Sequence, residues 1–314
     1  MSLDGIILVH KPEGCTSHDL VNNIRKILKQ KKVGHYGTLD PMATGLMLIA
    51  LGKATRLFPF FSKLDKEYTG EITLGFATDS YDATGTPLPP FSDIFPKEDV
   101  LVRTIGAFQG ELNQIPPIFS AKKYKGQPLY KLARAQKEVS PSSSLVTVYS
   151  FTLEKYSPPH IEFRVRCSTG TYIRSLAHDL GKKLGCGAHL SRLERTRVGE
   201  YSLQEAYTLD SIESQAKQDS DADLILPIED LLPHFPKLIL KDRAVRIAQN
   251  GNTLLPEHAL KLIPPVIDVT NQSQASEIFR VFSPEGKLVA FARKESDSMG
   301  LHPFLVIDSD TQIS

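Results

Sequence analysis

Hydrophobic and polar residues alternate with period two in two segments of the chain. One is KEYTGEITLGF (66–76) and the other is IEFRVRCS (161–168). Alternation of this kind indicates a β-strand that buries one face and exposes the other. A third segment, LMLIAL (46–51), is apolar throughout and stands between two glycines. Its length favours a strand buried on both faces, although a buried turn of helix fits the same pattern.

Two further segments repeat their apolar residues with the spacing of an α-helix. In GCTSHDLVNNIRKILKQ (14–30), Thr16 stands at the N-cap and Asp19 follows three residues later, which is a capping box. In TYIRSLAHDLGKKLG (171–185), the apolar residues share one face and the final glycine serves as a C-cap. Near the C-terminus, EIFRVFSPEGKLVAFARK places two β-rich runs around a turn sequence, which predicts a β-hairpin.

The order of these elements predicts the fold class. Strands outnumber helices and do not alternate regularly with them. This favours an α+β fold with a mixed, largely antiparallel central sheet flanked by helices over a doubly wound α/β fold. We expect two domains, residues 1–225 and 226–314, of which the second is a small β-rich module. The acidic QAKQDSDADL (215–224) indicates a surface linker or an insertion.

Composition excludes several classes of protein. The chain has 314 residues, of which 41% are hydrophobic and 23% charged, as in an ordinary folded protein. No apolar run approaches the roughly 20 residues that span a bilayer, and the N-terminal sequence lacks the features of a signal peptide. The three cysteines are far apart, and neither they nor the histidines have the spacing of a zinc site. We therefore expect a cytoplasmic protein without a structural metal.

Charge is unevenly distributed, although the net charge is only +1. Residues 121–137 carry six Lys/Arg and no acid, and residues 164–197 carry eight Lys/Arg against two acids. Residues 200–230 reverse the balance, with nine Asp/Glu and one lysine. The two basic stretches predict a localised phosphate-binding face. A helix with a solvated charged face explains the first stretch equally well.

Candidate chemistry centres on Asp40, in the glycine-rich GHYGTLDPMATG (34–45). An Asp-Pro pair commonly starts a turn, and a turn is the simplest explanation of this carboxylate. A P-loop is excluded because Ala54 follows the Gly-Lys pair where a hydroxyl is needed. No nucleophile elbow occurs, and the motif holds one carboxylate where a glycosidase uses two. Tyr68 and Arg174 are candidate partners, although each taken singly fits a structural position equally well.

Six passages together resemble the bacterial tRNA pseudouridine-55 synthase family. They span residues 11 to about 201 and are KPEGCTSHDLV, GHYGTLDPMATGLM, KEYTGEITLGFATDSYDATG, PPIFSAKKYKGQPLYKLAR, GTYIRSLAHDLG and LSRLERTRVGEY. The resemblance implies the pseudouridine synthase fold with a small C-terminal RNA-binding module of the PUA type. It also implies isomerisation of a T-loop uridine of tRNA to pseudouridine, after the base has been flipped out. This reaction needs no redox change and no external energy, so neither a cofactor nor a metal is expected.

The same resemblance implies roles for individual residues. Asp40 would be the catalytic nucleophile and would work ionised, either attacking the sugar or first abstracting a ribose proton. Arg174 would pair with Asp40 and favour its charged form. Tyr68 would stack on the target base, with its hydroxyl placed for proton exchange at C5. Tyr172 and Leu193 match positions that line the uracil pocket.

Contacts to the rest of the RNA are implied as well. His35 would probe the T-loop and occupy the space left by the flipped nucleotides. Basic residues would contact phosphates, which makes binding weaken as salt rises. These predicted phosphate contacts are Lys122, Lys123, Lys125, Arg192, Arg195 and Arg197. The sequence departs from the family pattern at Tyr36, which is bulkier than usual, and at Gln136, where the pattern has glycine.

The expected partner is the T-arm stem-loop of tRNA, with no membrane and no obligatory protein partner, and the expected state is a monomer. Two alternatives stay open. One is a tRNA-binding or tRNA-folding protein in which catalysis is secondary. The other is a pseudouridine synthase that depends on a guide RNA; the absence of long basic tails in the sequence counts against it.

Overall fold

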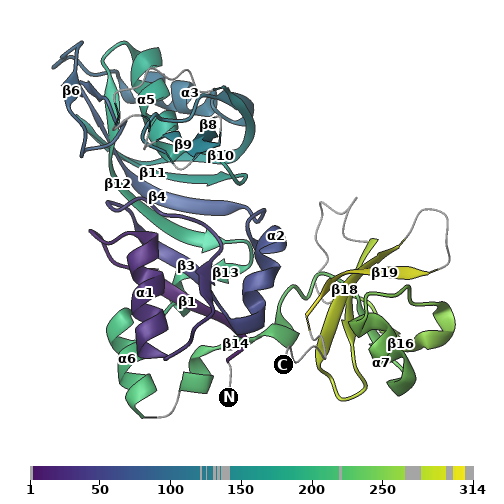
Figure 1. The fold of residues 1–314 in the computed structure, drawn as a ribbon. Coiled ribbons are helices and arrows are strands. Elements are labelled where there is room, and N and C mark those ends of the chain that lie inside the picture. The colour runs from purple at the N-terminus through teal and green to yellow at the C-terminus, as the bar shows by residue number, and fades with distance from the viewer. Residues whose placement is uncertain are drawn as a thin grey trace.

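The computed structural model describes residues 3–120, 122–124, 126–129, 132, 135, 142–218, 221–265, 277–294 and 300–307. Their strands form one large sheet, one five-stranded sheet and two short two-stranded pairs. The large sheet and its helices form the larger body in Figure 1, and the five-stranded sheet lies beside it near the C-terminal end of the chain.

Ten strands of the described residues form the large sheet, in the order β14-β1-β3-β12-β4-β11-β10-β7, with β2 paired to β3 and β13 paired to β12. These pairs are antiparallel except that of β12 with β3. The predicted α+β fold with a mixed, largely antiparallel sheet is confirmed. The strands are β1 (Gly5–Lys11), β2 (Val33–His35), β3 (Thr44–Leu51), β4 (Lys66–Leu74), β7 (Gly110–Gln114), β10 (Ser144–Ser157), β11 (His160–Cys167), β12 (Ala188–Val198), β13 (Tyr201–Ser202) and β14 (Leu226–Pro227).

The apolar run at 46–51 lies within β3, and both faces of this strand are buried as the sequence predicts. Met47 and Ile49 point into one apolar cluster, whereas Leu46 and Leu48 point into another on the opposite face of the sheet. Since successive side chains of a strand point to opposite faces, a strand between two cores must be apolar at every position.

Helices cover the first of these clusters. They are α1 (Ser17–Ile27), α3 (Glu98–Gly106), α5 (Ile173–Leu184) and α6 (Leu209–Lys217). Both predicted helices are present, and each has the one cap that the sequence predicts. Thr16 accepts a hydrogen bond from the Asp19 amide, and the Asp19 carboxylate accepts one from the Thr16 amide. Gly185 ends α5 in the left-handed conformation, with φ +79°, which glycine adopts without strain.

Of the two predictions for residues 215–224, a surface linker is wrong for the described ends of the segment, and an insertion stays a prediction. Residues 215–217 complete α6, and Leu224 is buried in the same cluster as Ile212 of that helix. Ala216 packs against this cluster as well, so two apolar side chains, Ala216 and Leu224, anchor the described ends of an otherwise polar segment to the core. The domain boundary after residue 225 stays a prediction; β14, which follows it, pairs with β1 of the large sheet.

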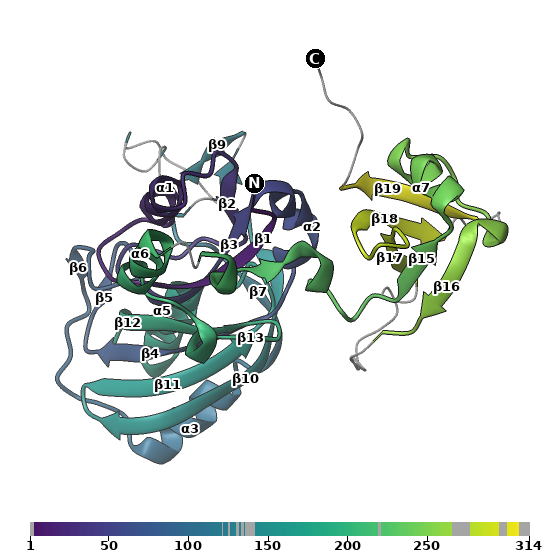
Figure 2. The same cartoon turned by 90° about the horizontal axis from the view of Figure 1, so that it is seen from below.

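The five-stranded sheet has the order β16-β15-β17-β18-β19, as Figure 2 shows from below. The predicted hairpin is confirmed as β17 and β18, which are antiparallel. The helix α7 packs against this sheet. The elements of this module are β15 (Lys237–Leu240), α7 (Asp242–Gln249), β16 (Ala259–Ile263), β17 (Ile278–Phe282), β18 (Leu288–Lys294) and β19 (Leu301–Val306).

Short elements connect these parts. The helix α2 (Phe58–Phe61) follows the 3₁₀ helix η1 (Gly52–Leu57) and packs between the large sheet and the C-terminal module. The remaining short elements are β5 (Ala77–Thr78) paired with β6 (Pro87–Leu88), β8 (Lys123–Tyr124) paired with β9 (Gln127–Pro128), and the 3₁₀ helices η2 (Leu203–Glu205), η3 (Asp221–Leu224), η4 (Ile228–Asp230) and η5 (Pro256–His258). In the described part of the chain, no helix has both the length and the apolar character to cross a membrane.

Candidate active site

Asp40 lies in the loop between β2 and β3, and two buried cations hold this loop on either side of it. The first cation is Lys11, at the end of β1, whose side chain is fully buried. Its ammonium group donates to the carbonyls of Pro12 at 2.8 Å, Pro41 at 3.3 Å and Ala43 at 2.7 Å. Three carbonyl acceptors compensate the burial of the charge and fix the backbone that follows Asp40.

The second cation is Arg195 of β12, which is 2% exposed. Its guanidinium donates to the carbonyls of Gly37 at 3.1 Å, Thr38 at 3.4 Å and Leu46 at 2.8 Å. The planar fork of an arginine suits several acceptors at once. The backbone that precedes Asp40 is therefore held against the sheet by a residue more than 150 positions away in the sequence.

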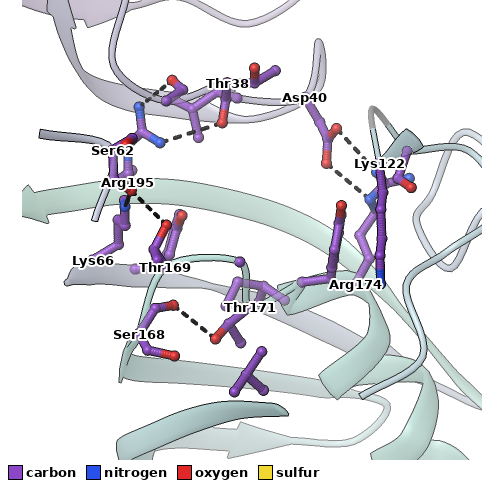
Figure 3. A pocket seen from close by; sticks show the side chains of 18 of the residues that line it. Thr38, Asp40, Ser62, Lys66, Lys122, Ser168, Thr169, Thr171, Arg174 and Arg195 are labelled. Carbon is purple, nitrogen blue, oxygen red and sulfur yellow. Dashed lines mark hydrogen bonds and ion pairs between the residues drawn. The ribbon is translucent and has the colours of Figure 1, made fainter. Parts of the chain in front are cut away.

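The carboxylate of Asp40 pairs with Arg174, which lies in the first turn of α5 (Figure 3). Arg174 Nη2 donates to Oδ1 at 3.1 Å, and Nε lies 2.9 Å from Oδ2, as an ion-pair contact without hydrogen-bond geometry. Arg174 also contacts a second carboxylate, since Nη1 lies 3.2 Å from Oδ2 of Asp82. Backbone carbonyls of Ser80 and Phe119 accept its remaining hydrogen bonds. The guanidinium is thus buried between two acids and fixed in orientation.

The surroundings shift the pKa of Asp40 in opposite directions. Burial raises the pKa of its carboxyl, the charge of Arg174 opposes this rise, and the charge of Asp82 adds to it. About a third of the Asp40 side chain, 36%, stays exposed, whereas Arg174 and Asp82 are each 5% exposed. Asp40 is therefore the member of the three that a ligand can reach.

Asp40 lines a pocket of about 570 Å³, and most of the predicted site residues line the same pocket. Tyr68 comes from β4, Leu193 from β12 and Tyr172 from the N-cap of α5. Burial raises the pKa of the Tyr68 phenol, so that its hydroxyl stays protonated at neutral pH. The predicted residues that line this one pocket are Asp40, Tyr68, Lys122, Tyr172, Arg174, Leu193 and Arg195.

His35 lies elsewhere, at the end of β2, and lines a neighbouring pocket of about 740 Å³ that also reaches Asp40 and Arg174. Burial lowers the pKa of His35, which favours the neutral imidazole. Its Nδ1 has no hydrogen-bond partner among the described residues. A neutral ring on the far side of the Asp40 loop is placed to contact a ligand by shape more than by charge.

The predicted phosphate contacts do not form one group. Lys122 donates to the carbonyl of Ser142 at 2.9 Å and to Oγ of Ser144 at 2.6 Å, at the rim of the pocket. Arg192 and Arg197 are exposed on β12. The burial of Arg195 and its commitment to three carbonyls argue against the phosphate contact predicted for it. Lys125 and Gln136, and the side chain of Lys123, lie outside the described residues.

Three residues of the site carried no predicted role. Asp82 holds Arg174 from the side opposite Asp40, and its own Oδ1 accepts from the amide of Thr84 at 3.0 Å. Gln114 brackets Tyr172, accepting from its amide at 2.7 Å and donating to its carbonyl at 3.0 Å. Lys66 lines the pocket two residues before Tyr68. The second acid of the segment TDSYD was the available signal for Asp82, and the signal for Lys66 was its place beside Tyr68 at the start of a strand. Gln114 had no signal beyond its residue type.

Tyr36, the bulky departure from the expected motif, is accommodated by packing. Its ring stacks on Phe61 of α2 with centroids 4.4 Å apart and planes 10° apart, and its hydroxyl donates to the carbonyl of Ala54. Within the described residues, no group of three or more His, Cys, Asp or Glu side chains could hold a metal ion.

Solved structures with a similar fold define the class of protein. The chain superposes with a TM-score of 0.71 on a protein from an H/ACA ribonucleoprotein bound to a substrate RNA containing 2′-deoxyuridine, at 26% identity, covering 97% of this chain and 85% of that chain. It superposes equally well, at 28% identity and with the same coverage, on a chain of a Cbf5-Nop10-Gar1 complex. The fold is that of the pseudouridine synthases.

Sequence comparison narrows the class to one family. Residues 25–173 match the N-terminal domain of the TruB family pseudouridylate synthases, and residues 174–233 match the C-terminal domain of tRNA pseudouridylate synthase B. The tRNA pseudouridine synthase B of Clostridium tetani is 37% identical over 97% of this chain and 100% of its own length. That of Bacillus subtilis is 42% identical over 80% of this chain and 84% of its own length. The chain belongs to the TruB family of pseudouridine synthases.

Proposed function

We propose that this chain converts the T-loop uridine at position 55 of tRNA to pseudouridine, with Asp40 as the nucleophile. The observation that carries the proposal is the accessible Asp40 carboxylate held by the buried Arg174, which Asp82 fixes from behind. Membership in the TruB family, whose curated relatives are tRNA pseudouridine synthases, supports the choice of substrate.

The proposed reaction is an isomerisation that balances without a co-reactant. The bond between C1′ and N1 breaks, the uracil turns within the pocket, and a bond between C1′ and C5 forms. C5 loses its proton and N1 ends protonated. Asp40 starts ionised and either attacks the sugar at C1′ or abstracts a ribose proton; both routes need the same carboxylate in the same place.

The other pocket residues hold the base. Tyr68 and Leu193 offer a flat aromatic ring and an apolar side chain that suit the two faces of a uracil. Tyr172 forms the wall next to Arg174, and its backbone is fixed by Gln114. A site built on strands and a helix N-terminus keeps these side chains within the tolerance that catalysis needs.

Access to a stacked base requires that the nucleotide flips out of the T-loop, at a cost of about a few kcal/mol. We assign to His35 the contact with the T-loop from which the base leaves, because it lines the pocket on the other side of Asp40. Lys122, Arg192 and Arg197 are the candidates for phosphate contacts that offset the cost. We further propose that the protein acts in the cytoplasm as a monomer, without a guide RNA or a partner protein.

The test uses the purified full chain alone, with an unmodified T-arm stem-loop as substrate, and maps pseudouridine by chemical sequencing. We expect one modified uridine, in the T-loop. Asp40→Asn should abolish the modification while the RNA still binds. Asp99→Asn is the matched control, because Asp99 is an exposed carboxylate that pairs with Arg103 on α3 and does not line the pocket.

Each alternative has its own outcome. Full activity in Asp40→Asn would overturn the nucleophile. Binding without modification by the unaltered chain would favour the tRNA-binding alternative. Modification that appears only after a guide RNA or a partner is added would favour the guide-dependent alternative.

A further inference from the structure

The pocket extends well past the residues to which the proposed reaction assigns a role. Its volume of about 570 Å³ lies in the range of about 300–1,000 Å³ that holds a whole drug-sized ligand. Asp40 and Arg174 take up only one end, and Figure 3 shows a second group of side chains around Arg195 on the opposite side. We call this group the far end of the pocket. It consists of Ser62, Lys66 and Thr169, together with Phe58, which lines the same pocket from the helix whose C-cap is Ser62.

Phe58 is the aromatic side chain of the far end, and it is 52% exposed. It begins α2, whose last residue, Phe61, is fully buried and stacks on Tyr36. This contact anchors the short helix, and Phe58 lines the pocket from it. In the described part of the chain no aromatic ring packs against Phe58. An exposed aromatic ring at the wall of a pocket is a surface on which a flat ligand can stack.

Polar groups of the far end are fixed around one backbone carbonyl. Thr169 Oγ1 donates to the carbonyl of Ser62 at 2.7 Å, which ties the turn after β11 to α2. Lys66 Nζ donates to the same carbonyl at 3.0 Å. These polar groups of the far end therefore form a floor that is fixed by hydrogen bonds and is not a chance gap between loops.

Lys66 brings a positive charge to this floor. It is 7% exposed, and no carboxylate of the described residues forms an ion pair with it. Burial and the nearby charge of Arg195 lower the pKa of Lys66 to about 8. Two of its three N–H donors are not used by the protein groups described, so an oxygen of a ligand is the partner that would compensate the buried charge.

We propose that the far end is a second nucleotide subsite, in which Phe58 stacks on the base adjacent to the target uridine and Lys66 donates to an oxygen of that nucleotide. An aromatic ring beside a cation is the combination with which proteins hold single-stranded nucleic acid with little sequence preference. This inference rests on the proposed function, since it requires the uridine to be bound at Asp40. It adds that the pocket holds two consecutive nucleotides.

The test separates binding from chemistry in the full chain. Single-turnover rates on the T-arm stem-loop are measured as a function of protein concentration, which gives a half-saturating concentration and a maximal rate. The variants are Phe58→Ala and Phe58→Trp. Phe91→Ala is the matched control, because Phe91 is 67% exposed and does not line the pocket. Two further substrates carry an abasic nucleotide, one just before and one just after the target uridine.

We expect Phe58→Ala to raise the half-saturating concentration about 10-fold or more, as loss of one stacked base does, with the maximal rate unchanged. Phe58→Trp keeps an aromatic ring, so its half-saturating concentration should match that of the unaltered chain. Phe91→Ala should leave this concentration unchanged. One of the two abasic substrates should weaken binding to the unaltered chain by a similar factor and should not weaken binding to Phe58→Ala further.

Two results would overturn the subsite while leaving the proposed function intact. The first is that the unaltered chain is active and Phe58→Ala has the same half-saturating concentration. The other is a loss in Phe58→Ala that multiplies with the loss from both abasic substrates, because independent effects mean that Phe58 touches neither base. An unaltered chain that fails to modify the stem-loop at any concentration would overturn the proposed function itself, and the subsite with it.

Discussion

Asp40 can act as a nucleophile only while it is ionised, and at the residue scale the site is an arrangement that controls this charge. Burial disfavours the ionised carboxylate, and the nearby Asp82 disfavours it further. Arg174 is the group that opposes both, and it does so from a buried position where electrostatic interactions are strong. Asp82 therefore has two effects: it fixes Arg174 in place, and it raises the pKa of Asp40.

This balance predicts how the rate depends on pH. Asp40 is protonated below its pKa, so the maximal rate should fall as the pH falls through that value. Arg174→Gln removes the charge that lowers the pKa of Asp40, and the acid limb of the profile should move to higher pH. Arg174→Lys keeps a charge but cannot bridge two carboxylates, so the limb should move less while the plateau rate still falls. Single-turnover rates at saturating RNA, measured from acid to alkaline pH, check both variants.

Arg166→Gln is the control for this prediction. Arg166 is 58% exposed and pairs with Asp65, and neither residue lines the pocket of Asp40, so its loss should leave the acid limb in place. A profile that keeps its acid limb unchanged in Arg174→Gln would contradict the assignment of that limb to Asp40.

At the scale of elements, the site depends on how closely β12 approaches β3. These are the parallel neighbours of the large sheet, and Arg195 lies opposite Gly45 in their register. Gly45 has φ +105°, and a Cβ added there would lie 2.4 Å from the carbonyl oxygen of Arg195. Only glycine both adopts this positive φ without strain and leaves room for the carbonyl oxygen of Arg195. The same approach brings the Arg195 guanidinium to the carbonyls of the Asp40 loop.

Gly45→Ala should therefore be far more costly than an ordinary glycine substitution. We expect a loss of about 3 kcal/mol or more in the free energy of unfolding, from backbone strain and from the forced separation of the strands. Gly14→Ala is the matched control, since Gly14 has φ +82° but nothing within 4 Å of its added Cβ; strain alone should cost about 1–2 kcal/mol. Urea unfolding of both variants gives the comparison. Equal losses would mean that the strands do not meet as closely as this register requires.

The sequence alone predicts individual helices and strands better than it predicts which of them are neighbours. Period and capping identify α1, β3, β4, β11 and α5, because these signals are local. Local signals do not reveal that β12 passes between β3 and β4, nor that Leu224 returns to the core. For the site, Asp40 and Arg174 are 134 positions apart, and only the family resemblance connected them. The positions of Lys66 and Asp82 depend on packing that no short segment encodes.

At the scale of the whole molecule, the two sheets share one apolar cluster. The ring of Phe60 in α2 lies 5.5 Å from that of Phe235 and 4.8 Å from that of Phe291, which belongs to β18. It also lies 6.1 Å from the ring of Phe304 in β19. The neighbouring residue, Phe61, points the other way and stacks on Tyr36 beside the Asp40 loop. The short helix thus connects the C-terminal module to the wall of the pocket.

Phe60→Ala should loosen the C-terminal module without unfolding the large sheet. The variant removes three ring contacts of a half-buried side chain, so we expect a loss of about 2 kcal/mol, below the 3–5 kcal/mol typical of a fully buried phenylalanine. Because the three partner rings lie in the C-terminal module, hydrogen exchange should accelerate at the amides of β17 to β19 and stay unchanged in β4. Phe91→Ala, which truncates an exposed ring far from this cluster, should change neither. If exchange accelerates equally in β4 and β18, the two sheets unfold as one unit, and α2 is part of a single core instead of a joint between two.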